Sequence, residues 1–192
     1  MLYTRKGDSG TTKVFNSEPG KRISKASCRT EALGSLDELN SFLGLCKVHL
    51  KATRYTLHAI RYTLHATRFT DIVHEVQQNL FIVQAELAGA PKTIEQAKVT
   101  ALEVLIDTAE KEMPPIKTFF ISGGTELAVL FDVARTLARR AERRVVAAVE
   151  EGGVKIGADT LAYLNRLSSL LYALARLSNH KAGLKEQAPD YK

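Results

Sequence analysis

Apolar residues recur at steps of three and four through most of the chain, which is the spacing of one face of an α-helix. Leucine and cysteine follow this rule from residue 36 to residue 50, and leucine, isoleucine and valine follow it from residue 72 to residue 87. Alternation with a period of two, the pattern of a half-buried strand, is almost absent. The pattern predicts an all-α fold, organised as a helical bundle.

Turn and capping residues divide this pattern into five expected helices. Ser24 is a candidate N-cap for the first helix, and Gly89-Ala90-Pro91 is expected to end the second. The expected bounds of the last three helices are 94–111, 125–150 and 158–180. A chain of 192 residues has the size of one domain. We therefore expect a single domain over 1–192, with a polar loop (1–23), a helical bundle (24–180) and a polar tail (181–192).

A tandem repeat lies between the first two expected helices. The heptad RYTLHAI at 54–60 is followed by RYTLHAT at 61–67. Because seven residues make about two helical turns, whole heptads lengthen a helix with little rotation of its faces. His58 and His65 are too far apart along such a helix to bind one metal ion. This favours a neutral extension over a binding role.

Charge and cysteine content limit the partners and the compartment. The formal net charge is +6 and the pI is near 9.3, which favours anionic partners such as nucleotides, nucleic acids or anionic lipids. Cys28 and Cys46 form no C-x-x-C pair, so free thiols in a reducing compartment are expected. With no signal-peptide core and no apolar run of about eighteen residues, the expected location is cytoplasmic, away from membranes.

The polar segment 4–12 combines glycines, hydroxyls and cations. Backbone N–H groups and positive charge in such a loop can surround a polyphosphate. The segment does not have the spacing of a Walker A motif. It is therefore either a phosphate-binding loop of another kind or a flexible polar N-terminus.

Charged residues form a stripe on the fourth expected helix, beside its apolar arc. Helical geometry places Arg135, Arg139 and Glu142 on this stripe, and turns Arg140 and Arg144 away from it. A shielded arginine needs an anionic partner, whereas the alternative is a solvated run with local ion pairs. The last helix carries a polar stripe that comprises Asn165, Ser169, Tyr172 and Arg176. A polar stripe by itself usually indicates only solvent exposure.

Four ordered blocks resemble the PduO-type family of ATP:corrinoid adenosyltransferases over nearly the whole chain. The blocks are YTRKGDSGTT at 3–12, EALGSLDELNS at 31–41, ARTLARRAER at 134–143 and LNRLS at 164–168. The resemblance implies a homotrimer of ferritin-like five-helix subunits, with ATP between neighbouring subunits and the corrinoid beside it. Departures from the family pattern occur at Ser122, where many members have proline, and at Ser169, where many have aspartate.

The resemblance also implies a role for individual residues. Asp37 would pair with Arg135 across the subunit boundary, and Phe119 would occupy the lower face of the corrinoid; these three are the candidate catalytic residues. The residues expected to hold ATP are Thr4, Gly7, Ser9, Gly10, Thr11, Lys25, Arg135, Arg139, Glu142 and Asn165.

The implied reaction is attack by the cobalt of cob(I)alamin on the 5′ carbon of ATP, giving adenosylcobalamin and triphosphate. Mg²⁺ is expected on the phosphates, with no dedicated protein ligands. Further expected partners are a cob(II)alamin reductase or an adenosylcobalamin-dependent enzyme. Two alternatives are a non-catalytic, ATP-responsive corrinoid carrier and a basic helical nucleic-acid-binding module. Few aromatic residues lie among the basic ones, which disfavours nucleic acid as a partner.

Overall fold

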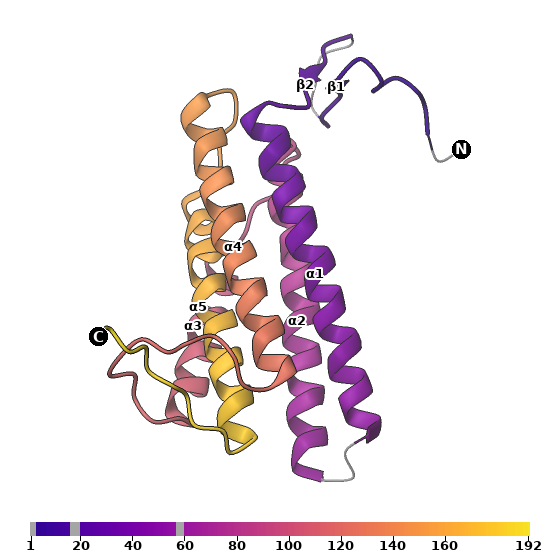
Figure 1. Cartoon of the computed structure of the whole chain (residues 1–192). Helices are drawn as coiled ribbons and strands as arrows, with labels where there is room; N and C mark the ends of the chain where they lie inside the picture. The colour runs from indigo at the N-terminus through magenta and orange to yellow at the C-terminus, as the bar shows by residue number, and fades with distance from the viewer. Residues whose placement is uncertain (1–2, 16–19, 57–59) are drawn as a thin grey trace.

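The computed structural model describes residues 3–15, 20–56 and 60–192, with the side chains of 53–67 left undescribed. Within that part of the chain, five helices form one elongated bundle (Figure 1). Helix α1 packs against α2 and α4, and α5 packs against α4 and α3. The helices are α1 (Cys28–Thr56), α2 (Ile60–Leu87), α3 (Gln96–Lys111), α4 (Glu126–Glu151) and α5 (Ala158–Lys181). The predicted all-α, five-helix fold is confirmed.

A small antiparallel sheet precedes the bundle. Strand β1 (Thr11–Thr12) pairs with β2 (Ile23–Ser24), so the predicted polar loop contains a short two-stranded ribbon. The prediction that Ser24 caps the first helix was wrong, because Ser24 belongs to β2 and the helix begins four residues later. The Ser27 hydroxyl instead accepts a hydrogen bond from the Thr30 N–H at 3.3 Å, as an N-cap does.

The ends of α3, α4 and α5 lie close to their predicted positions. Helix α4 begins one residue after its expected start at Thr125, because Thr125 is its N-cap and accepts a hydrogen bond from the Ala128 N–H at 3.1 Å. Helix α3 begins two residues after the expected Ile94, because the Ile94 N–H donates to the Thr160 hydroxyl of α5 at 3.2 Å. The bounds of these three helices were therefore readable from the sequence to within two residues, and the contact between α3 and α5 was not.

Small residues on one face of α4 allow its neighbours to approach closely. Ala134, Ala138, Ala141 and Val145 of the predicted apolar arc are fully buried, whereas Leu127 is only half-buried. They face the buried leucines of α1 and α5, each of which contributes about 1.5–3 kcal/mol when fully removed from water. This packing fixes α4 and α5 side by side.

The tandem repeat lies where α1 and α2 meet. The bounds of the two helices show that both extend into the repeat, as expected for an extension. His58 lies outside the described residues, as does the side chain of His65, so the expectation that they bind no metal stays a prediction. None of the described helices is both long enough and apolar enough to span a bilayer.

Candidate functional site

A cavity of about 510 Å³ opens between α4, α5 and the segment that precedes α4. Three predicted site residues, Phe119, Arg135 and Arg139, share this cavity. The first comes from the 114–125 segment and the two arginines from α4, which rises beside that segment in Figure 1. The remaining lining residues are Ile116, Thr118, Phe120, Ser122, Asp132, Ser168, Ser169 and Tyr172.

Arg135 is held in place by two neighbours that sequence reasoning missed. Its Nε donates to the Asp132 carboxylate at 2.6 Å, and its guanidinium carbon lies 5.9 Å from the centre of the Tyr172 ring. The spacing of three residues between Asp132 and Arg135 is a helical ion-pair signal that could have been read in advance. The predicted partner Asp37 is exposed on α1 and makes no side-chain polar contact within the part of the chain that the structure describes.

Tyr172 contributes a neutral hydroxyl to the lining of the cavity. Burial raises the pKa of Tyr172, and the positive charge of Arg176 opposes that rise without cancelling it. The phenol therefore stays protonated at neutral pH and keeps its ability to donate a hydrogen bond. In the cavity, that donor and the arginines together favour an anionic ligand.

Arg139 is the exposed cation of the cavity. Across residues 3–15, 20–56 and 60–192 its guanidinium has no ion-pair partner, so its charge is available to a ligand. One turn further along α4, the Glu142 carboxylate accepts a hydrogen bond from the Asn165 side chain of α5 at 3.0 Å. Glu142 and Asn165 therefore extend the polar surface beyond the cavity, as the stripe predicted.

Arg140 and Arg144 lie apart from this stripe, as expected, because they face α1. Arg140 pairs with Glu38, and Arg144 lies 3.6 Å from the Glu31 carboxylate. Their charges are compensated by interhelical ion pairs. The arginine-dense sequence of α4 is thus divided between the bundle surface and the cavity.

The N-terminal loop is folded on itself around Thr11. Arg22 donates from Nε to the Thr11 hydroxyl at 2.8 Å and from Nη2 to the Thr11 carbonyl at 2.7 Å. The Lys25 N–H donates to the Gly10 carbonyl at 2.9 Å, and Gly10 has φ 76°. A Cβ atom on Gly7 would lie 3.0 Å from Lys25 Nζ. Glycine suits Gly10 because its backbone is left-handed, and the lack of a side chain at Gly7 leaves room for the Lys25 ammonium.

The other two predicted residues of this loop differ in their surroundings. The Ser9 hydroxyl lies 3.4 Å from that of Thr11, so it belongs to the same cluster. Thr4 is exposed and makes no side-chain hydrogen bond among the residues described. The structure thus gathers Gly7, Ser9, Gly10, Thr11 and Lys25, with Arg22 as an added cation that the sequence did not single out.

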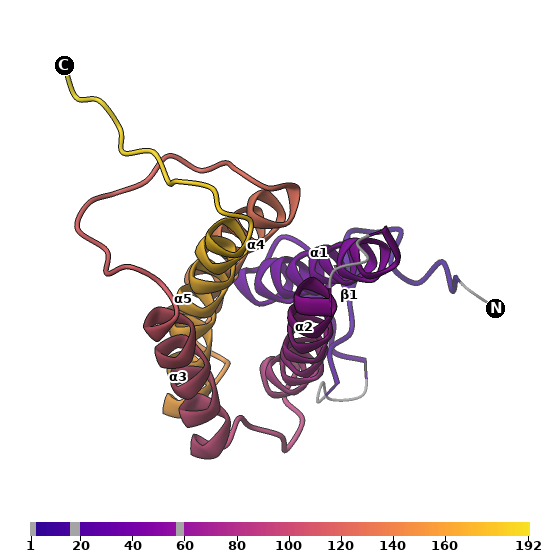
Figure 2. The same ribbon diagram turned by 90° about the horizontal axis from the view of Figure 1, so that it is seen from below.

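The N-terminal loop and the cavity lie on different sides of the molecule. In Figures 1 and 2 the N-terminal loop extends beyond α1, whereas the 114–125 segment and the C-terminal tail lie beyond α4 and α5. No hydrogen bond or ion pair of the described side chains joins the loop to the cavity. Among all the residues that the structure describes, no cluster of three or more His, Cys, Asp or Glu is suited to a metal ion.

Phe119 projects from its segment with 78% of its surface exposed. Ser122, which departs from the family pattern, lines the same cavity. After it, Gly124 has φ 102° and lies so close to the Asn179 side chain that a Cβ atom would collide with it. Glycine is therefore required at Gly124 for the segment to turn into α4 against α5.

Comparisons with known proteins show the family of the chain. The family profile for cobalamin adenosyltransferase matches residues 2–178. Corrinoid adenosyltransferase PduO of Citrobacter freundii is 40% identical over 188 residues, which cover 94% of this chain and 50% of that protein. The chain thus spans about half the length of the PduO relatives. Corrinoid adenosyltransferase of Bacillus subtilis is 36% identical over 187 residues, covering 95% of this chain and 89% of that protein.

Solved structures give the same result. A variant of the PduO-type ATP:corrinoid adenosyltransferase from Lactobacillus reuteri, complexed with cobalamin and ATP, superimposes with a TM-score of 0.84. It is 29% identical, with 100% of this chain and 97% of that chain covered. Another variant of that enzyme, complexed with ATP, has a TM-score of 0.81 at 31% identity, with 98% and 100% covered. The chain belongs to the cobalamin adenosyltransferase family.

Proposed function

We propose that this protein transfers the 5′-deoxyadenosyl group of ATP to cob(I)alamin. The cobalt electron pair forms the Co–C5′ bond, the C5′–O bond breaks, and triphosphate leaves with the electron pair of the broken C5′–O bond. The observation that carries the proposal is one cavity that combines the exposed aromatic Phe119 with Arg135 and Arg139. Relatives named corrinoid adenosyltransferase, and a similar structure holding cobalamin and ATP, support it.

The reaction needs positioning and charge stabilisation, and the site has side chains for both. Because cobalt is the nucleophile, no protein side chain has to attack or to remove a proton. Arg139, without an ion-pair partner among the described residues, can stabilise the departing triphosphate, and Arg135 is oriented by Asp132. Fixed cations and alignment of the reacting atoms are large catalytic effects. Mg²⁺ is expected to accompany the phosphates, keeping several of its waters.

Phe119 is proposed to act on the corrinoid. A lower axial ligand donates electrons to cobalt(II) and makes it harder to reduce, since axial ligation and local polarity tune the potential of a metal. An apolar ring that covers the lower face excludes water and other ligands from that position. Since Phe119 is exposed in the single subunit, its ring is available for such a contact.

The complete site is proposed to form between subunits of a homotrimer. The proposal rests on the separation of the N-terminal loop from the α4/α5 cavity (Figure 2), and on Asp37, which can then meet Arg135 of a neighbour. Helices α1 and α4 also present apolar side chains outward, at Leu45 (50% exposed) and Val129 (41%). A subunit interface on this face would remove these apolar side chains from water.

Light scattering tests the assembly. We expect the mass of a trimer, and we expect Leu45→Asp to lower that mass together with activity. A monomeric wild-type protein with full activity would contradict the shared site.

The same chemistry suggests the setting of the protein. The substrate must be supplied as cob(I)alamin, so a cob(II)alamin reductase is a proposed partner, and an adenosylcobalamin-dependent enzyme is the proposed recipient of the product. A cytoplasmic location is proposed with them.

The test of the proposed function is spectroscopic. The protein is mixed anaerobically with MgATP and chemically reduced cobalamin, and the corrinoid spectrum is followed. We expect many turnovers to adenosylcobalamin per subunit. A carrier would change the spectrum only up to one equivalent of protein, and a nucleic-acid-binding module would not change it.

A further inference from the structure

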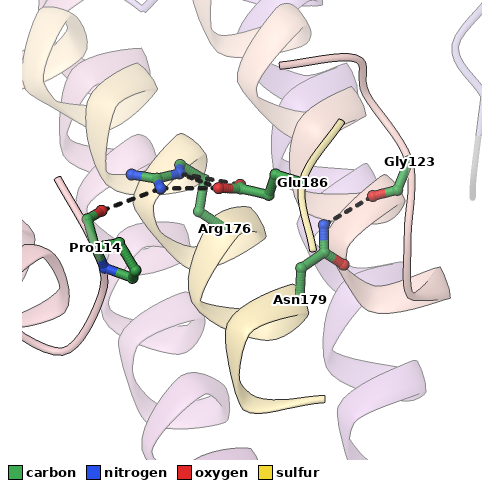
Figure 3. A network of polar contacts seen from close by, with 5 residues as sticks. All are labelled: Pro114, Gly123, Arg176, Asn179 and Glu186. Carbon is green, nitrogen blue, oxygen red and sulfur yellow. Dashed lines mark hydrogen bonds and ion pairs between the residues drawn. The ribbon is translucent and has the colours of Figure 1, made fainter. Parts of the chain in front are cut away.

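A buried arginine on α5 joins the C-terminal tail to the segment that carries Phe119 (Figure 3). Only 6% of Arg176 is exposed, although its polar stripe alone suggested solvent exposure. Its Nε lies 3.0 and 2.9 Å from the two Glu186 carboxylate oxygens, and its Nη2 lies 2.8 Å from one of them. Its Nη2 also donates to the Pro114 carbonyl at 3.4 Å, and the Phe120 ring centre lies 5.1 Å from the guanidinium carbon.

A second residue of α5 holds the far end of the same segment. Asn179 donates to the Gly123 carbonyl at 2.9 Å and accepts from the Thr125 N–H at 2.9 Å. Between these two anchors, the Ile121 N–H donates to the Gln187 carbonyl of the tail at 2.8 Å. The segment is therefore held from α5 at both ends and by the tail in the middle.

Polar contacts are what attach the tail. None of the residues after Ala182 is buried, so the tail has no apolar anchor in the core. The Glu186–Arg176 pair is shielded, with side-chain exposures of 17% and 6%, and it directly precedes the Gln187 contact. A buried guanidinium that loses its carboxylate is strongly disfavoured. Glu186 thus both neutralises Arg176 and brings the next residue to the segment.

We infer that Glu186 is a positioning residue, which acts through Arg176 and Gln187 to hold Phe119 over the cavity. The inference rests on the proposed function of Phe119. The Phe119 ring is itself largely exposed, so its placement depends on its two following neighbours. Phe120 stacks on Arg176, and Ile121 is bonded to the tail. The C-terminal tail is therefore part of the site that sets the lower face of the corrinoid.

The first test measures the segment directly. Hydrogen exchange is compared for wild type, Glu186→Gln and the control Asp190→Asn, all in the full chain. Asp190 lies on the same tail and its carboxylate bonds only to the Lys192 N–H among the described contacts, so the control makes the same chemical change without touching α5. In Glu186→Gln, we expect the Ile121 amide to exchange about tenfold faster or more, since a charge-assisted anchor is lost. Unchanged exchange would overturn the inference.

The second test separates positioning from general damage. Adenosylation is measured from cob(II)alamin with a reductant and from pre-reduced cob(I)alamin. We expect Glu186→Gln to resemble Phe119→Ala, with a loss of about tenfold or more from cob(II)alamin, little loss from cob(I)alamin and an unchanged KM for ATP. Equal losses from both substrates would overturn the inference.

A second variant and the wild type complete the design. Arg176→Lys keeps a buried positive charge but loses the fork that reaches Glu186 and Pro114 together, so it should show the same split to a smaller degree; equal losses would again count against positioning. If wild type itself forms no adenosylcobalamin, the proposed function fails, while the exchange experiment still decides whether Glu186 holds the segment.

Discussion

Phe119→Ala should leave the protein stable and damage one assay selectively. Full burial of a phenylalanine side chain contributes about 1.5–3 kcal/mol, but Phe119 is 78% exposed, so only about a fifth of its surface is covered. The expected loss of stability is therefore about 0.3–0.6 kcal/mol. For a chain of this size that corresponds to a fall in Tm of about 1–2 °C. A core phenylalanine would instead cost about 3–5 kcal/mol.

The assay compares two starting points for the same reaction. From cob(II)alamin and a reductant, the variant should lose activity about 10- to 100-fold, because a lower ligand can then reach cobalt and hinder its reduction. From cob(I)alamin, which lacks axial ligands, the loss should be small. The control is Phe81→Ala on α2, which is 61% exposed and lies outside the cavity. A large fall in Tm, or equal losses in both assays, would refute the reasoning.

Three further predictions concern the proposed Asp37–Arg135 ion pair, the N-terminal loop and a buried thiol. Asp37→Ala and Arg135→Ala should each weaken assembly and ATP use. The loss of free energy in the double variant should be smaller than the sum of the two single losses by about 0.5–3 kcal/mol. Strictly additive losses for Asp37 and Arg135, with Arg135 coupled only to Asp132, would exclude the intersubunit pair. Hydrogen exchange of residues 4–12 should slow when ATP is added, and equal exchange with and without ATP would exclude a phosphate-binding loop. Burial raises the pKa of Cys46 from 9.0 to about 11, so a thiol reagent at pH 8 should modify it slowly until denaturant is added. The unfolding free energy should fall as the pH rises from 9.0 towards 11, because the unfolded thiol ionises first; rapid modification of the folded protein would contradict its burial.

Local sequence rules predicted the helices well and failed where distant segments meet. The alanine arc of α4 follows from helical periodicity, and the expected start of the helix at Thr125 lies one residue from the observed start. The start of α1 was misplaced because Ser24 pairs with the N-terminal loop instead. That pairing depends on Thr11, thirteen residues earlier, and helical periodicity carries no information about it.

The candidate site divides in the same way. Helical periodicity singled out Arg135 and Arg139, and the family resemblance added Phe119. The structure places these three residues together. Asp132 could have been read from its spacing to Arg135. The burial of Arg176 could not have been read in advance, because it depends on a contact with Glu186 of the tail, ten positions later in the sequence.

The central claim is that the 5′ carbon of ATP is transferred to cobalt, and product stoichiometry tests it most directly. The protein would be given ATP labelled with ¹³C at the 5′ position, Mg²⁺ and excess cob(I)alamin, and the products would be followed by ¹³C and ³¹P NMR. We expect the label to move to a cobalt-bound methylene and one triphosphate to be released for each adenosylcobalamin formed. Release of phosphate or diphosphate without a labelled Co–C bond, or intact ATP beside bound corrinoid, would contradict it.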